Sequence, residues 1–426
     1  MTHSILDVGC RPAKYRAAFM GAALMLALVC AAPQAAFSAD KPKGQEISRV
    51  IAKEMTAAQK ALQASQWAEA IKNLEAAETK SGLTPFDQKT IHYFKGFANI
   101  KLGNLKAAQS ELEKALATGA ATAEEKGQYT RTLFGIAAST SQFQKTIDYG
   151  KEMAEAGSAT PNDLAIIAQS YFQLKDCKNA GTWVDKAVSA SRKAGEAPKE
   201  NLFLFKLQCA SDASDNTAMV PVLQELIRLN NKSSYWNTLL RIERQDERDD
   251  RNTLMIYRIM YNTNSMNADT DYIEMAQLLA DAALPGEAQS VLEKAMTTPG
   301  VLKEEHKERT SRLLNSLKVR ADADRKGLAS FDAEASKSPV GELGVKLGEV
   351  YYGFGEYQKG VDAITAGLVK QQIKHLDEAY VYLGLAEVQL KNFAEAKRTF
   401  ASLKLVPNIS PRVLRLWSLY SETVGR

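Results

Sequence analysis

The chain has 426 residues, of which 45% are hydrophobic and 24% charged, and its formal net charge is +4. This charge is too small to indicate a nucleic-acid partner, and the sequence contains neither a basic stripe nor an RNA-binding motif. The hydrophobic fraction is ordinary for a folded chain and suffices for a packed core.

Residues 1–38 have the layout of a secretory signal peptide. Basic residues precede an apolar run at 17–32, and small residues follow it. We predict cleavage after Ser38 and export to the periplasm, because cleavage after Ala39 would place Phe37 where a small residue is required. The alternative is an uncleaved inner-membrane anchor, although residues 17–32 are short compared with the roughly 20 residues of a span.

After a short polar lead-in at residues 39–46, the pattern predicts helix pairs over residues 47–409. No stretch of useful length alternates between apolar and polar residues, so we expect an almost wholly helical fold. Residues 410–426 predict a C-terminal capping helix that starts at Pro411 and covers the open face of the last pair. Within it, we interpret Trp417 as a core residue.

The clearest internal repeat lies at residues 377–408. An aromatic residue, a Leu-Gly pair, an Ala-x3-Phe pattern and a proline occur there as Tyr380, Leu383-Gly384, Ala396, Phe400 and Pro407. Equivalent residues recur upstream, and Gly360 precedes Ala396 by 36 residues. The intervals resemble the tetratricopeptide (TPR) pattern, which has a period of about 34 residues. This resemblance implies an all-α TPR-type α-solenoid of about ten helix-turn-helix repeats, and spacing alone places the eighth repeat at about 304–339.

A strongly charged segment, residues 241–251, mixes four arginines with acidic residues. Such a run is typical of a solvated helix end and turn with some ion pairs between neighbouring turns. A docking patch for a partner is the alternative interpretation.

Cleavage of the signal peptide would leave two cysteines, Cys177 and Cys209. An even pair in an exported protein favours a disulfide. We predict that the two sulfurs lie within bonding reach, because the predicted helices that carry them pack antiparallel and bring these ends side by side. The alternative is a pair of buried free thiols.

Nothing in the sequence has the spacing of a known catalytic or metal-binding motif. Three histidines, His92, His306 and His375, follow the predicted cleavage site, and they belong to distant repeats. Phosphate-binding loops, nucleophile elbows and zinc-protease motifs do not occur. We therefore expect a non-enzymatic protein without a metal or small-molecule cofactor.

A stack of helix pairs offers instead a long concave surface made by the first helix of each repeat. Amides there can bond a peptide backbone, and exposed aromatic rings are preferred anchors for a protein partner. The predicted partner-binding residues are Gln59, Tyr93, Phe97, Gln169, Phe172, Phe205, Gln208, Gln277 and Tyr352. The alternative for each ring is that it only fills space between neighbouring helices.

Part of the chain resembles a narrower group, the exported bacterial TPR proteins associated with TonB-type energy transduction. The resemblance is carried by the Lys199-Glu200-Asn201 start and the Lys232-to-Trp236 end that flank one repeat, and by residues 275–279 and 291–294. It implies a periplasmic accessory of a TonB/ExbB/ExbD-type transport complex, with inner-membrane components as protein partners. The competing hypothesis is an envelope factor that binds a glycan or polysaccharide. The oligomeric state is not indicated by the sequence.

Overall fold

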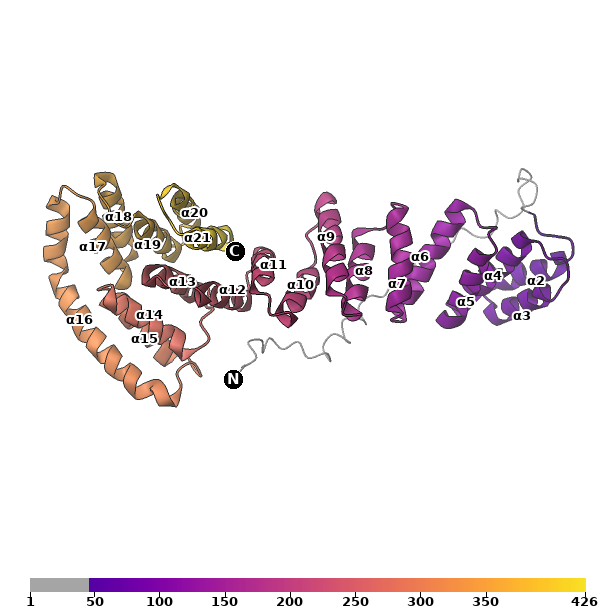
Figure 1. Ribbon diagram of the computed structural model, residues 1–426, viewed down its shortest axis with the longest axis horizontal. Coiled ribbons are helices and arrows are strands. Elements are labelled where there is room, and N and C mark those ends of the chain that lie inside the picture. Colours follow the sequence, from indigo (N-terminus) through magenta and orange to yellow (C-terminus); the bar gives the residue numbers. More distant parts are fainter. Residues whose placement is uncertain (1–45) are drawn as a thin grey trace. The chain divides into compact units, whose positions relative to one another are not determined.

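The computed structural model describes residues 46–426, which fall into two compact units that divide between Glu196 and Ala197 (Figure 1). The predicted signal peptide at 1–38, the alternative anchor at 17–32 and the lead-in up to residue 45 lie outside the described residues. Within residues 46–426, no helix combines the length and the apolar character that crossing a membrane requires.

The N-terminal unit consists of four helical hairpins. Its helices are α2 (Ala52–Gln63), α3 (Trp67–Glu78), α4 (Pro85–Lys101), α5 (Leu105–Ala117), α6 (Ala123–Ser139), α7 (Phe143–Glu155), α8 (Pro161–Gln173) and α9 (Cys177–Lys193). Each hairpin contacts the next, because the second helix of one pair packs on the first helix of the following pair.

Local sequence signals determine where these hairpins start and turn. The first helices α4, α6 and α8 each begin with a capping box, in which a threonine side chain accepts from the backbone N–H of an acidic residue three positions later. Each hairpin turn places one residue in the left-handed region, as Gly103 does with a φ of 76°. The chain can therefore reverse within a few residues.

Small residues permit the close crossing of the two helices in a hairpin. A Cβ atom on Gly96 would lie 2.9 Å from Leu112 Cγ, and one on Gly348 would lie 2.3 Å from an Ile364 side-chain carbon. On Gly384 it would lie 2.5 Å from the Phe400 ring. The TPR pattern places a small residue at each of these positions.

The C-terminal unit contains the remaining helices. They are α10 (Glu200–Asp212), α11 (Asn216–Leu229), α12 (Ser233–Gln245), α13 (Asp250–Asn262), α14 (Asp269–Asp281), α15 (Pro285–Thr297), α16 (Glu304–Lys337), α17 (Glu342–Gly353), α18 (Tyr357–Lys370), α19 (Leu376–Gln389), α20 (Phe393–Ala401), the 3₁₀ helix η2 (Ser402–Leu405) and α21 (Pro411–Thr423). No strand occurs among residues 46–426. Both units are thus built from TPR-type hairpins, and the predicted all-α TPR solenoid fold is confirmed.

The predicted eighth hairpin is wrong, because residues 304–337 form one helix of 34 residues, α16. This stretch contains no proline, and its one glycine, Gly327, is not in a left-handed conformation that would end a helix. A single stripe of side chains is buried along it: Thr310, Leu314, Leu317, Ala321, Leu328 and Ala335. In Figure 1, α16 runs along α14, α15 and α17, and it contacts all three.

The C-terminal helix α21 is a cap, and it also returns onto earlier helices of its unit. Trp417 is fully buried, as predicted, and its ring centroid lies 5.2 Å from that of Phe400 in α20. The same helix also contacts α11 and α13, and the Tyr420 ring meets Trp236 of α12 edge-on at 6.3 Å. The cap therefore covers more than the last hairpin.

Substitution of Gly367 by alanine should destabilise the C-terminal unit by about 1–3 kcal/mol, because the new Cβ would overpack a crossing made by backbone. It would lie 2.7 Å from the Gly341 carbonyl oxygen and 2.9 Å from the Val345 nitrogen. Gly327→Ala in the exposed part of α16 is the matched control, since a Cβ there meets nothing within 4 Å. The Gly327→Ala substitution should raise the free energy of unfolding by roughly 0.5–1 kcal/mol, because alanine has a higher helix propensity than glycine. Urea unfolding measures both, and equal effects would contradict the close-crossing account.

Candidate functional site

The candidate site lies on the first helices of the N-terminal hairpins. Five predicted residues lie there and are half-buried: Gln59 on α2, Tyr93 and Phe97 on α4, and Gln169 and Phe172 on α8. We call this set the amide–aromatic row. Each helix positions its member by the same hairpin geometry, so the row follows the stacking of the repeats.

Two aromatic members of the row are held by neighbouring rings. Tyr93 stacks on Tyr129 of α6 with centroids 5.0 Å apart and an interplanar angle of 21°. Phe97 meets Trp67 of α3 edge-on at 5.9 Å. Burial raises the pKa of Tyr93, so its hydroxyl stays protonated at neutral pH. These rings fill space between repeats, as the alternative interpretation stated, and they also leave part of their surface exposed.

The two amides of the row, Gln59 and Gln169, differ from the rings. Neither side chain makes a hydrogen bond to the part of the chain that the structure describes, and both are half-buried. A primary amide supplies two donors and one acceptor with two lone pairs. Both groups can therefore pair with the N–H and C=O of a peptide backbone.

A ladder of polar contacts ties the starts of successive first helices together. The Ser48 backbone N–H donates to Asp87 at 2.9 Å, Lys89 donates to Glu125 at 2.7 Å, and Arg131 donates to Asp163 at 3.1 Å. The acceptors are the acidic residues of the capping boxes. Burial opposes ionisation of Glu125, but hydrogen bonds from Lys89 and Thr122 lower its pKa overall. This ladder fixes the register of the repeats that carry the row.

The two predicted aromatic site residues of the C-terminal unit are buried, which favours the alternative that they fill space between helices. Phe205 is 6% and Tyr352 is 8% exposed. The Tyr352 ring packs edge-on against Tyr382 of α19 at 5.3 Å and tilts against Tyr357 at 5.6 Å. Of the two amides, Gln208 donates to Asp212 at 2.7 Å, and Gln277 is half-buried. The predicted rings of the C-terminal unit are therefore buried, whereas its predicted amides are half-buried.

The C-terminal unit fills its own interior through α13 and α19. Every residue of α13 from 253 to 260 is buried, which leaves this helix no solvent-facing side there. Arg258 in its middle pairs with Glu287 of α15 at 3.3 Å and also donates to the hydroxyl of Tyr382 on α19. The Tyr382 hydroxyl in turn donates to Glu287 at 2.7 Å. This buried triad holds three helices that are distant in sequence.

The charged segment 241–251 comprises the end of α12, the turn after it and the start of α13, and Asp246, Arg248, Asp249 and Asp250 are exposed, as expected for a solvated helix end. Other charged side chains of the segment pair with other helices of the same unit. Arg241 pairs with Asp271 at 3.0 Å and Glu243 with Arg415 of α21 at 2.6 Å. Arg251 pairs with Asp377 of α19 at 3.0 Å. Partners so distant along the chain could not be identified from the segment itself.

The motifs that carry the resemblance to TonB-associated proteins are packing motifs. Lys232 pairs with Glu200 at 2.6 Å, and the Tyr235 hydroxyl donates to the same carboxylate, which links the starts of α10 and α12. The Trp236 indole N–H donates to Asn231 at 2.6 Å. These contacts explain why the residues occur together without assigning them a partner.

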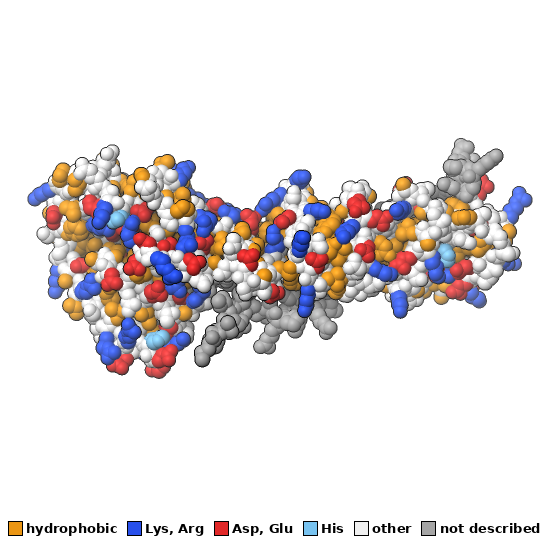
Figure 2. Space-filling view, in the orientation of Figure 1, with side chains coloured by type: hydrophobic (Ala, Val, Ile, Leu, Met, Phe, Trp, Pro, Cys, Tyr) orange, Lys and Arg blue, Asp and Glu red, His pale blue; other side chains and the backbone are white. Residues whose placement is uncertain are grey.

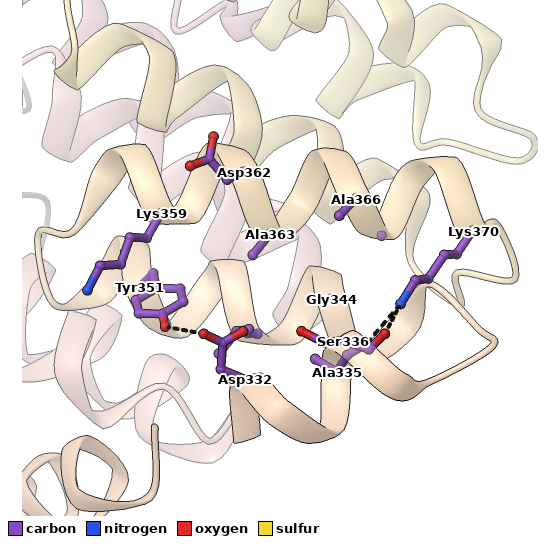
Figure 3. Close-up of a pocket in the computed structure, with 12 residues that line it drawn as sticks. Asp332, Ala335, Ser336, Gly344, Tyr351, Lys359, Asp362, Ala363, Ala366 and Lys370 are labelled. Carbon is purple, nitrogen blue, oxygen red and sulfur yellow. Dashed lines mark hydrogen bonds between the residues drawn. The ribbon is translucent and has the colours of Figure 1, made fainter. Parts of the chain in front are cut away.

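A slot of about 300 Å³ lies between α16 and α18 (Figure 3). Small side chains such as Ala363 and Ala366 line it. All charged groups on its rim are bonded within the protein: Asp332 to Tyr351, Lys359 to Glu356, Asp362 to Gln358, and Lys370 to two backbone carbonyls of α16. The slot thus offers no free charge that would select a ligand.

The two cysteines lie in helices of different units, Cys177 at the start of α9 and Cys209 near the end of α10. In the structure each of them is disulfide-bonded. Among the described residues, no group of three or more His, Cys, Asp or Glu side chains is arranged to hold a metal ion.

Comparison with known proteins gives structural matches only. No family model and no curated protein matches the chain. A tetratricopeptide repeat protein from Parabacteroides merdae is 12% identical, with 64% of this chain and 100% of that chain covered and a TM-score of 0.31. The TPR2AB-domain:pHSP90 complex of yeast Sti1 is 15% identical, with 63% of this chain and 98% of that chain covered and a TM-score of 0.33. Naa15/Naa10 bound to HypK-THB is 13% identical, with 84% of this chain and 59% of that chain covered and a TM-score of 0.39.

Substitution of Arg258 by methionine should destabilise the C-terminal unit by about 3–5 kcal/mol, because Glu287 would remain buried without its cation. The matched control is Arg398→Met, which removes an exposed pair with Glu395 and should cost less than about 0.5 kcal/mol. Chemical unfolding followed by circular dichroism measures both. A small loss for Arg258→Met would contradict the role of the triad.

The bond between Cys177 and Cys209 stays a prediction of the sequence. An unreduced tryptic digest of the protein should yield one cross-linked peptide pair that contains both residues, detected by mass spectrometry. Reduction should lower the free energy of unfolding by about 3–4 kcal/mol, since the bond would close a loop of roughly thirty residues. Recovery of both thiols in alkylated form without reduction would contradict it.

Proposed function

We propose that this protein is a non-enzymatic scaffold whose N-terminal unit holds an extended segment of a protein partner on the amide–aromatic row. The observation that carries the proposal is the pair of half-buried amides, Gln59 and Gln169, that have no hydrogen-bond partner among the described residues. An extended segment exposes backbone donors and acceptors at regular intervals, which amides can satisfy without selecting a charge.

The row favours a peptide over a glycan. Sugar rings are bound by flat aromatic faces beside carboxylates, whereas the row combines rings with amides. The face of Tyr93 is already stacked on Tyr129, and Phe97 is tied to Trp67. Basic and acidic side chains are interspersed over the face of the molecule that Figure 2 shows.

The finer proposal is that the protein acts in the periplasm as an accessory of a TonB-type transport complex and binds its inner-membrane components. Two features of the sequence support it: the signal-peptide layout of residues 1–38, and the resemblance centred on residues 197–295. The TPR hairpins are compatible with this role, since repeats of this kind present extended surfaces to partners.

In-cell photo-crosslinking tests the proposal directly. A photoreactive amino acid at position 59 or 169 should capture the same partner protein, which mass spectrometry identifies. The control is the same amino acid at Glu75, an exposed residue on the second helix α3, which should capture nothing specific. An inner-membrane energy-transduction protein among the captured species supports the finer proposal.

Other outcomes decide between the hypotheses. Equal capture from positions 59, 169 and 75 would contradict binding on the row. A different captured protein would retain the scaffold and overturn the transport role. Empty crosslinks combined with specific binding on a glycan array would favour the glycan hypothesis instead.

A further inference from the structure

Glu349 on α17 is a buried carboxyl group with one unsatisfied oxygen. The residue is 1% exposed, and its Oε2 accepts from Lys346 Nζ at 2.8 Å on the same helix. Its Oε1 is buried and has no hydrogen-bond partner within the described part of the chain. A buried ionised oxygen in that state is costly, whereas a protonated carboxyl needs less solvation.

The charged and titratable groups around Glu349 come from several helices. Lys346, which donates to Glu349, also lies 3.7 Å from the carboxylate of Glu378 on α19. Glu378 in turn pairs with Arg251 of α13. The α13 cation Arg258 acts on Glu349 electrostatically, but its hydrogen bonds go to the α15 carboxylate Glu287 and to Tyr382.

The remaining helices that pack against α17 are α16 and α18. One charged group from each of these helices contacts Tyr351 of α17. Asp332 of α16 accepts from the Tyr351 hydroxyl at 3.4 Å, and Lys359 of α18 lies 5.4 Å from its ring centroid. No further cation is therefore bonded to the free oxygen of Glu349.

The protonation of Glu349 follows from this environment. Burial raises the pKa of Glu349 to about 7, although the neighbouring Lys346 acts in the opposite direction. Glu378 differs, because its hydrogen bond and ion pair with Arg251 outweigh its own burial and lower its pKa. Glu378 is therefore ionised near neutral pH, whereas Glu349 gains or loses its proton there.

We propose that Glu349 makes the packing of α17 against α15 and α19 sensitive to pH around neutrality. The protonated group is compatible with the closed C-terminal unit, and loss of the proton loosens α17. The sign follows from linkage, because a carboxyl that binds its proton more tightly in the closed state favours closure at low pH. That contribution is complete below the ordinary pKa of about 4.5 and is lost as the pH rises through about 7.

Hydrogen–deuterium exchange of the full chain tests this proposal. After correction for intrinsic exchange rates, amide protection in α17 should fall about tenfold between pH 6 and pH 8.5, as expected for a group with these two pKa values. Glu349→Gln should abolish this pH dependence, since the amide cannot ionise. Glu334→Gln, an exposed position on α16, is the control for the same change of charge and should retain it.

A second variant keeps the test decisive if Glu349→Gln does not fold. Lys346→Gln removes the cation that favours ionisation, so the loss of α17 protection should move to higher pH. Unchanged pH dependence in Glu349→Gln, or an unshifted transition in Lys346→Gln, would overturn the proposal. A flat protection profile in the unmodified protein would overturn it as well.

Discussion

A helical hairpin cannot bury its own apolar face, and the rest of this structure depends on that constraint. The N-terminal unit satisfies it by stacking hairpins, with polar ladders such as Lys89–Glu125 that fix the register at one end. The C-terminal unit buries the apolar faces of its hairpins by packing its last helices onto earlier ones. There α19 and α21 cover earlier helices, and the buried contacts of Arg258 with Glu287 and Tyr382 hold the closure.

This difference assigns separate roles to the two units. A face that neighbouring repeats leave half-exposed remains available to a partner, as with Gln59 and Gln169. A face that the chain itself covers is not available, as with Tyr352. The C-terminal unit instead contains buried ionisable groups such as Glu349, which we proposed above to make the packing of α17 depend on pH. The proposed binding surface and the proposed pH-sensitive group therefore lie in different units.

The sequence predicted those features that depend on contacts between neighbouring segments. Capping residues and small residues such as Gly384 located the hairpins because each acts within its own repeat. Long-range packing could not be predicted in this way. Arg251 pairs with Asp377, which lies 126 residues further along the chain. Tyr352 is buried against Tyr382, which belongs to the next hairpin. Helix α16 was missed because spacing alone predicted a turn for which residues 304–337 contain no signal.

In the N-terminal unit the aromatic rings of the row are half-exposed, whereas the predicted rings Phe205 and Tyr352 of the C-terminal unit are buried. Hydroxyl-radical footprinting of the free protein tests this difference most directly, because oxidation reports the exposure of individual rings. The account predicts that Phe97 is oxidised readily, whereas Phe205 and Tyr352 are protected until the C-terminal unit unfolds. Oxidation of Tyr352 in the folded protein as fast as that of Phe97 would contradict it.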